Sequence, residues 1–163
     1  MKTTLSGSTL VIESDYNSFE NATMNIKIKM PTLEALKTSG GVSAKGTGII
    51  NGKKIKLESS SGSSIDLQVE VEEVTGESSS GSTLVLTGKA LEADLSASSG
   101  SSIEADKMLV NKVTADASSG SSILIQPLIS IDGKASSGGS VKYVGSPKEV
   151  KRDESSGGSV SGN

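Results

Sequence analysis

The 163-residue chain contains no histidine, cysteine or tryptophan, and these absences exclude several kinds of active site. Without histidine there is no His-dependent catalytic triad, no imidazole general base and no histidine metal ligand. Without cysteine there are no thiol nucleophiles, disulfides, thiolate zinc sites or iron–sulfur clusters. The aromatic residues are Tyr16, Phe19 and Tyr143, too few for a platform that stacks bases or sugars. We therefore expect no catalytic residue, no cofactor and no metal ion.

The charge and hydropathy of the chain exclude further classes. The net charge is −3 and the isoelectric point about 5.1, so the chain lacks the basic footprint of a nucleic-acid-binding protein. No apolar run approaches the ~20 residues of a membrane-spanning helix. Residues 1–12 lack the basic start and apolar block of a signal peptide.

Serine and glycine dominate the composition, with 33 and 19 residues. Such a composition is typical of flexible, low-complexity segments. However, Leu, Ile, Val and Phe together number 38, which with the low net charge argues against disorder. The serines and glycines also recur at a fixed interval, which indicates a repeat protein.

Six Ser-Ser-Gly motifs set the repeat length, because their glycines are separated by 19, 19, 20, 18 and 19 residues. A period near 20 residues indicates a solenoid, in which each unit buries its apolar face against its neighbours. Glycine permits the sharp turns that such a solenoid needs, and the adjacent serines can form ladders between coils. We expect these motifs to be structural corners, with a binding ridge as the alternative. The corner glycines are Gly62, Gly81, Gly100, Gly120, Gly138 and Gly157.

Apolar residues occupy fixed positions relative to each corner and are spaced by two residues, the period of a β-strand. This spacing predicts an all-β parallel β-helix with two or three short strands per coil and six or seven coils. One set lies three residues after each glycine, and another lies seven residues before it: Ile65, Leu84, Ile103, Ile123, Val141 and Val160, then Ile55, Val74, Ala93, Val113, Ile131 and Val150.

The amino-terminal third is less regular. We expect one strand at residues 10–12 and a second at residues 25–30, in which Ile26, Ile28 and Met30 alternate with polar residues before Pro31. A polar loop over residues 15–21 should connect them.

Two further signals follow Pro31. Residues 38–41 are expected to form an earlier corner, and Asn51-Gly52 to form a turn. We expect residues 1–163 to form one β-helix domain, less regular over 1–58 and regular over 59–163.

Two segments carry a resemblance to a known family. Residues 25–40, NIKIKMPTLEALKTSG, resemble the strand–Pro–x–Leu–x–x–Leu–x–x–Ser-Gly segment of the head GIN domain, the auto-transporter adhesin family common in Bacteroidetes. Residues 138–148, GGSVKYVGSPK, are similar to its closing Gly-Gly-x-Val-x-Tyr-x-Gly-x-Pro segment. The resemblance runs from about residue 8 to the end of the chain.

The resemblance implies a right-handed, single-stranded parallel β-helix with a pectin-lyase-like shape but without pectin-lyase catalytic residues. It also implies an extracytoplasmic location, in the cell envelope, at the cell surface or in the periplasm, and a role in adhesion. Family members usually carry a further β-rich segment before the first strand, so we expect the full-length protein to have one.

Four other functions remain as alternatives. A carbohydrate-active β-helix enzyme would need paired carboxylates, and the richest acidic stretch is Glu70, Glu72, Glu73 and Glu77. A calcium solenoid would need an Asp after each corner, whereas only Asp66 fits. An ice-binding surface would favour Thr-x-Thr ranks over this serine ladder. A purely structural spacer is also open.

Self-association is a further hypothesis, because the open ends of a β-helix present unpaired strand edges. The charged cluster Lys148, Lys151, Arg152, Asp153 and Glu154 precedes the last corner. This cluster is expected to be a cap that discourages stacking, with a salt-sensitive contact in a homo-oligomer as the alternative.

Together these observations predict a non-enzymatic surface module that mediates adhesion or assembly through one face of the β-helix. Its partner would be a surface ligand, either a glycan or a protein. The outward side chains that we expect at the centre of the binding face are Asp66, Gln68, Glu104, Asp106 and Gln126.

Overall fold

The structure, a computed structural model, describes residues 1–13 and 24–163. Contacts divide the chain into two compact units, residues 1–30 and residues 31–163, which are described separately. The assignment of the whole chain to one domain stays a prediction. The polar loop expected over residues 15–21 lies outside the described residues.

The first unit contains an antiparallel hairpin. Strand β1 (Lys2–Ser6) pairs with β2 (Thr9–Glu13), and Gly7 turns the chain between them with a φ of 59°. This confirms the strand expected at residues 10–12. The strand expected at residues 25–30 is wrong: residues 24–30 have no regular secondary structure, and Ile26, Ile28 and Met30 are exposed. Alternation gives a strand only where another strand supplies hydrogen bonds, and residues 24–30 pair with no strand in the described part of the chain.

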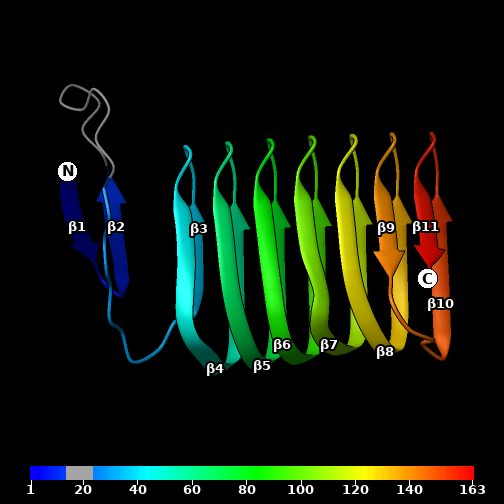
Figure 1. The fold of residues 1–163 in the computed structure, drawn as a ribbon, viewed down its shortest axis with the longest axis horizontal. Helices are drawn as coiled ribbons and strands as arrows, with labels where there is room; N and C mark the ends of the chain where they lie inside the picture. Colours follow the sequence, from blue (N-terminus) through cyan, green and yellow to red (C-terminus); the bar gives the residue numbers. More distant parts are fainter. Residues whose placement is uncertain (14–23) are drawn as a thin grey trace. The chain divides into compact units, whose positions relative to one another are not determined.

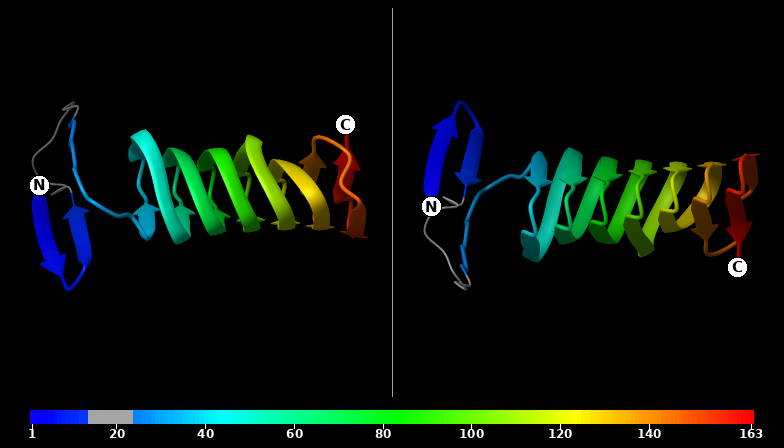
Figure 2. Two further views of the ribbon diagram at one scale, coloured as in Figure 1. Left: turned by 90° about the horizontal axis from the view of Figure 1, so that it is seen from below. Right: turned by 90° about the horizontal axis from the view of Figure 1, so that it is seen from above.

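The second unit is a parallel β-solenoid with about seven coils and a spacing near 19 residues, as the Ser-Ser-Gly period predicts. Successive coils lie side by side in Figure 1, and the two perpendicular views in Figure 2 show the same stacking. Each strand pairs in parallel with the next coil, and the last coil is made by β10 on β8 and β11 on β9. The strands are β3 (Ala35–Thr38), β4 (Ser43–Ser59), β5 (Ser64–Ser78), β6 (Thr83–Ala97), β7 (Ser102–Ala117), β8 (Ser122–Ala135), β9 (Ser140–Tyr143), β10 (Glu149–Glu154) and β11 (Ser159–Gly162).

Each central coil is one long strand of 14 to 17 residues, and not the two or three short strands expected. The chain turns sharply at the Ser-Gly corners and bends smoothly at the opposite edge (Figure 1). We call these the corner edge and the bend edge. The first face is the part of each strand that follows a corner, such as residues 64–70 in β5. The second face is the part that precedes the next corner, such as residues 73–78.

The expected turn at Asn51-Gly52 is also wrong, because both residues lie within β4 and pair with Glu70 and Val71 of β5. The strand bends gradually here instead, and β4 pairs in parallel with β5 both before and after the bend edge.

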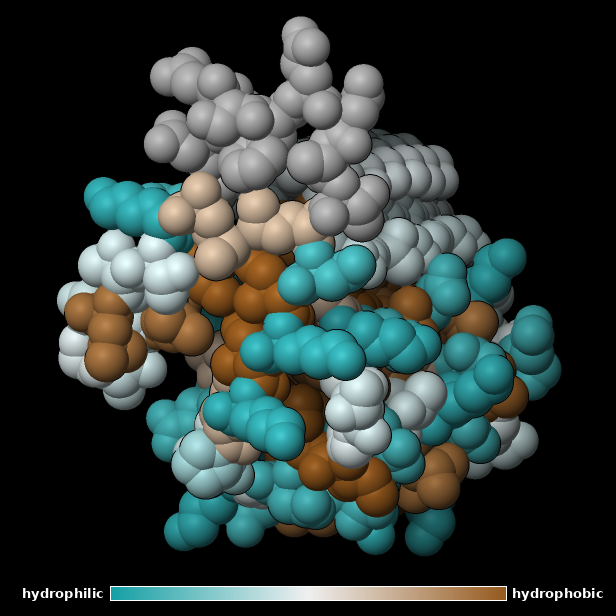
Figure 3. Space-filling view, turned by 60° about the vertical axis from the view of Figure 1, so that its left-hand side comes forward, coloured by the Kyte–Doolittle hydropathy of each residue, from teal (hydrophilic) through white to brown (hydrophobic). Residues whose placement is uncertain are grey.

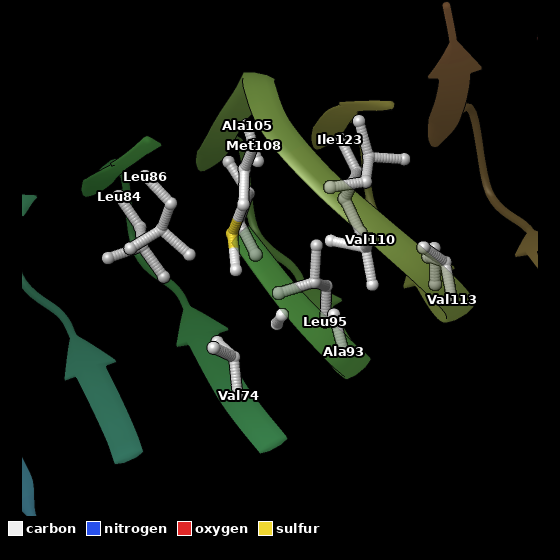
Figure 4. Close-up of a cluster of buried hydrophobic side chains, with 14 of the residues drawn as sticks. Val74, Leu84, Leu86, Ala93, Leu95, Ala105, Met108, Val110, Val113 and Ile123 are labelled. Carbon is white, nitrogen blue, oxygen red and sulfur yellow. The ribbon is translucent and has the colours of Figure 1, made fainter. Parts of the chain in front are cut away.

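The core fills the space between the two faces, and the side chains labelled in Figure 4 point into it. All six apolar residues expected three positions after the corner glycines are at most 2% exposed. Those expected seven positions before are at most 4% exposed, except in the last coil, where Val150 is 40% exposed. The two-residue period therefore identified the core.

The corners are two-residue turns in which both central residues have positive φ. Ser61 and Gly62 have φ values of 53° and 68°, and the amide of Ser63 donates to the carbonyl oxygen of Ser60 at 3.2 Å. Positive φ at both positions is typical of a type I′ turn. The same geometry recurs at all six Ser-Gly corners, and the earlier corner at residues 38–41 is confirmed with positive φ at Gly40 and Gly41.

A buried serine follows four of the corner glycines and ties neighbouring coils together. Ser101 Oγ donates to the carbonyl oxygen of Ser78 in the preceding coil at 2.7 Å and accepts from the amide of Ser98 at 3.1 Å. Equivalent hydroxyls bond in the same way, so the polar groups buried at the corner are satisfied. The serines of this ladder are Ser63, Ser82, Ser101 and Ser121.

Candidate functional site

The predicted binding residues all lie on the first face, with side chains directed away from the core. Asp66 and Gln68 belong to β5, Glu104 and Asp106 to β7, and Gln126 to β8. Gln68 and Glu104 are exposed and the other three are partly exposed. The structure therefore places these residues on one surface.

They do not form a continuous row. Asp66 and Glu104 share one column of register partners, but Val85 of β6 lies between them. Two coil spacings separate the carboxylate-bearing strands by roughly 9–10 Å. Leu124 of β8 continues the same column, so apolar side chains interrupt the acidic ones.

A bulge in β7 moves Asp106 out of register. Val85 pairs with Glu104, but Thr87 pairs with Lys107, so β7 carries one extra residue here. Asp106 and Lys107 consequently both face outward, and Met108 returns to the core with no exposed surface. The extra residue accounts for the single 20-residue separation between corner glycines, Gly100 to Gly120.

Ion pairs neutralise part of the first face. Lys45 Nζ lies 2.8 Å from Asp66 Oδ2, and Lys89 Nζ lies 3.1 Å from Glu70 Oε2. The hydrogen bond and charge of Asp66 raise the pKa of Lys45. A ligand that uses the Asp66 carboxylate must therefore compete with Lys45 or contact both.

The second face carries a network of ion pairs that we did not predict. Lys37 and Lys56 both bind Glu58 at 2.8 Å, and Lys56 also lies 3.2 Å from Glu77. Hydrogen bonds from Lys37 and Lys56 lower the pKa of Glu58 to about 2. The network links β3, β4 and β5. The two pairs that join coils, Lys37–Glu58 and Lys56–Glu77, each link residues 21 positions apart, and this spacing was the signal in the sequence.

The acidic stretch that an enzyme would need does not form a facing pair of carboxylates. Glu70 lies on the first face beside Lys89, Glu72 at the bend edge, and Glu73 on the second face, 2.7 Å from Lys54. Glu77 is held by Lys56 in the network described above. Glu70, Glu73 and Glu77 therefore serve in cross-coil ion pairs.

Two shallow depressions indent the second face. One, of about 270 Å³, is lined by Lys37, Glu58, Glu77 and serines of the corner edge. The other, of about 350 Å³, is lined mainly by Glu73, Thr75, Glu92, Asp94, Lys112 and Thr114. Both open to solvent and are mostly polar, unlike the enclosed apolar pockets that hold small-molecule cofactors.

The corner edge is a surface of hydroxyl groups and backbone. The serine before each corner glycine is exposed, whereas the ladder serines are buried. In the space-filling view, pale residues recede in regular rows along this edge, without strong hydrophilic or apolar character (Figure 3). The corner hydrogen bonds account for the positions of these residues, as the structural hypothesis expects.

Within residues 1–13 and 24–163, no three carboxylates converge in an arrangement that could hold a metal ion. The same residues form no helix with the length and hydropathy of a membrane span.

Comparisons with known proteins agree with this architecture. A family model described as "Putative auto-transporter adhesin, head GIN domain" matches residues 1–147. The crystal structure of a putative adhesin from Bacteroides fragilis NCTC 9343 matches with a TM-score of 0.85 and 22% identity, over 99% of this chain and 76% of that chain. At this identity the structural likeness shows the fold alone. No curated protein matches the chain.

Proposed function

This chain belongs to the family described as putative auto-transporter adhesins with a head GIN domain, and on that premise we propose that it is a non-enzymatic adhesion module. It would act outside the cytoplasm, in the cell envelope or at the cell surface. The names of the family and of the structural neighbour support this proposal.

The observation that carries the proposal is the first face itself. It is a rigid surface on parallel strands, and its outward residues change from coil to coil while the core and corners repeat. Asp66, Val85, Glu104 and Leu124 succeed one another in one column. Variation on an invariant scaffold is how repeat proteins build specific binding surfaces.

The proposal also accounts for the carboxylates. Several of them, including Asp66, Glu70 and Glu73, pair with lysines across coils, and the two depressions are open to solvent. Such a surface suits a large ligand that lies along the solenoid, and it offers no enclosed cavity for a reaction.

The test is binding of the purified chain to arrays of glycans and matrix proteins. We expect saturable binding to at least one ligand, and weaker binding for the triple variant D66N/E104Q/D106N. The matched control is E92Q/D94N/D116N, which removes three carboxylates from the second face. Equal loss of binding in both variants would contradict a first-face site.

A polysaccharide degradation screen separates this proposal from an enzyme. We expect no release of products. Release of oligosaccharides, abolished by substitution of a carboxylate, would overturn the adhesion proposal. Fractionation of the source cells tests the location, and recovery of the chain only in the cytoplasm would contradict it.

A further inference from the structure

The last coil differs from all the others at two inward positions. Arg152 is the register partner of Gly133, and Glu154 is the register partner of Ala135. In the earlier coils the first position holds Leu36, Leu57, Gly76, Leu95, Ala115 or Gly133, and the second holds Thr38, Ser59, Ser78, Ala97, Ala117 or Ala135. Small or apolar residues at these positions therefore give way to two opposite charges at the carboxyl-terminal end of the solenoid.

Arg152 covers the end of the core. Its Nη2 atom donates to Tyr143 Oη at 2.7 Å, and its guanidinium carbon lies 5.8 Å from the centre of the Tyr143 ring. Tyr143 itself is 6% exposed. The absence of a side chain at Gly162 leaves room for this ring, because a Cβ there would lie 2.5 Å from Tyr143 Cε2. The apolar core thus ends beneath a tyrosine and an arginine.

Glu154 binds the outer edge of β11, the edge that faces away from β9. The amides of Ser159 and Asn163 donate to the preceding coil, at 3.0 Å each. Because amides alternate in direction along a parallel strand, the amide of Val160 points outward, where a further strand would bind. Glu154 Oε1 accepts from that amide at 2.6 Å.

We propose that Arg152 and Glu154 form a cap that closes this end of the solenoid to strand addition, in particular to a second copy of the chain. An added coil would have to displace Glu154 from Val160 and bury both charges against its own core. Burial of charged groups without new partners is strongly unfavourable. The cap does not depend on an adhesive role.

The test replaces both residues with those found at the same positions in β6. We expect R152L/E154A to self-associate as its concentration rises, with at least a doubling of mass by light scattering, while the native chain keeps one mass. The control K151L/D153A also removes one positive and one negative charge and also introduces a leucine and an alanine, but on the outward side of β10. If R152L/E154A keeps the native mass, or if the control assembles equally, the proposal is overturned.

A second measurement decides the matter if R152L/E154A fails to fold. In the native chain, hydrogen exchange followed by NMR should be at least tenfold slower at the Val160 amide than at the Gly162 amide on the same edge. E154A, which removes the acceptor, should reduce this protection while the Ser159 amide, paired within the sheet, keeps its rate. Equal exchange at Val160 and Gly162 in the native chain would show that Glu154 does not cap the edge.

Discussion

A Cβ atom placed on Gly76 would lie 2.9 Å from Cδ2 of Leu95, its register partner in the next coil. The same atom would lie 2.9 Å from Cδ2 of Leu84. Leu57, Gly76 and Leu95 occupy one inward column in successive coils. A residue without a side chain therefore makes room for the leucine beside it, and the core is filled by size complementarity between coils.

The first prediction is that Gly76→Ala lowers the free energy of unfolding by about 1–3 kcal/mol, because the added methyl group overpacks this column. In a Leu95→Ala background the same substitution should cost less, because one of the two close contacts is removed and Leu84 can relax into the space that Leu95 leaves. Urea unfolding measures both. The control is Gly52→Ala, where an added Cβ meets no atom within 4 Å. Equal costs in the native and Leu95→Ala backgrounds would contradict the packing argument.

The second prediction concerns the serine ladder. Ser101→Ala removes the hydroxyl that links Ser98 and Ser78, so we expect a loss of about 1–2 kcal/mol in urea unfolding. The adjacent Ser102 points outward on the first face, and Ser102→Ala should change stability by less than about 0.5 kcal/mol. The ladder would lose its assigned role if the two variants were equally stable.

The third prediction follows from the positive φ at both corner residues. Ser80 has a φ of 54° and Gly81 a φ of 69°, and nothing would touch a Cβ at Gly81. Gly81→Ala should therefore cost about 1–2 kcal/mol from backbone strain alone. Ser80→Gly relieves such strain in the folded state but gives the unfolded chain more conformational freedom. Because these two effects oppose each other, the free energy of unfolding should stay within about 1 kcal/mol of the native value. Thermal unfolding of the two variants would refute this if Ser80→Gly proved the more harmful.

The fourth prediction is a pH dependence at Glu58. Its pKa of about 2 in the folded state lies below the ordinary carboxyl value of 4.5, so its ion pairs stabilise the protein above that value. The contribution is lost as the pH falls from 4.5 toward 2. Since Lys37 and Lys56 are largely exposed, solvent screening keeps it near 1 kcal/mol or less.

Urea unfolding between pH 7 and pH 2.5 measures this effect in the native chain and in Glu58→Gln. The stability difference between the two should shrink as the pH falls, because protonated Glu58 resembles glutamine. A matched control is Glu104→Gln, whose carboxylate forms no ion pair with a described residue. If the difference in free energy of unfolding between the native chain and Glu58→Gln were constant with pH, the ion pairs of Glu58 could not be its source.

The sequence predicted the parts of this fold that repeat. Ile65 and its equivalents were identified as core because a two-residue period and a fixed corner distance act together. The residues at 25–30 showed the same alternation, but pairing depends on a neighbouring strand that local sequence does not specify. The residues of the candidate face do point outward on one surface, whereas its role in binding stays a prediction. Its continuity was not predictable, because the extra residue in β7 shifts the register of Asp106 and Lys107.

The last prediction concerns a position where the repeat pattern alone would mislead. Gly139 occupies the place of the ladder residue Ser121, so Gly139→Ser restores the repeat pattern. In the structure, however, a Cβ at Gly139 would collide with the carbonyl carbon and oxygen of Ala117 and lie 2.9 Å from the amide nitrogen of Ser118. These are backbone atoms and cannot rotate away.

We therefore expect Gly139→Ser to lower the free energy of unfolding by at least about 2–3 kcal/mol, as overpacking does in tight cores. Urea unfolding checks this, with Ser140→Thr on the exposed side of β9 as a control. A neutral or stabilising effect of Gly139→Ser would mean that coils β8 and β9 are farther apart than the hydrogen bond of 2.9 Å from the Ser140 amide to the Ser121 carbonyl oxygen indicates.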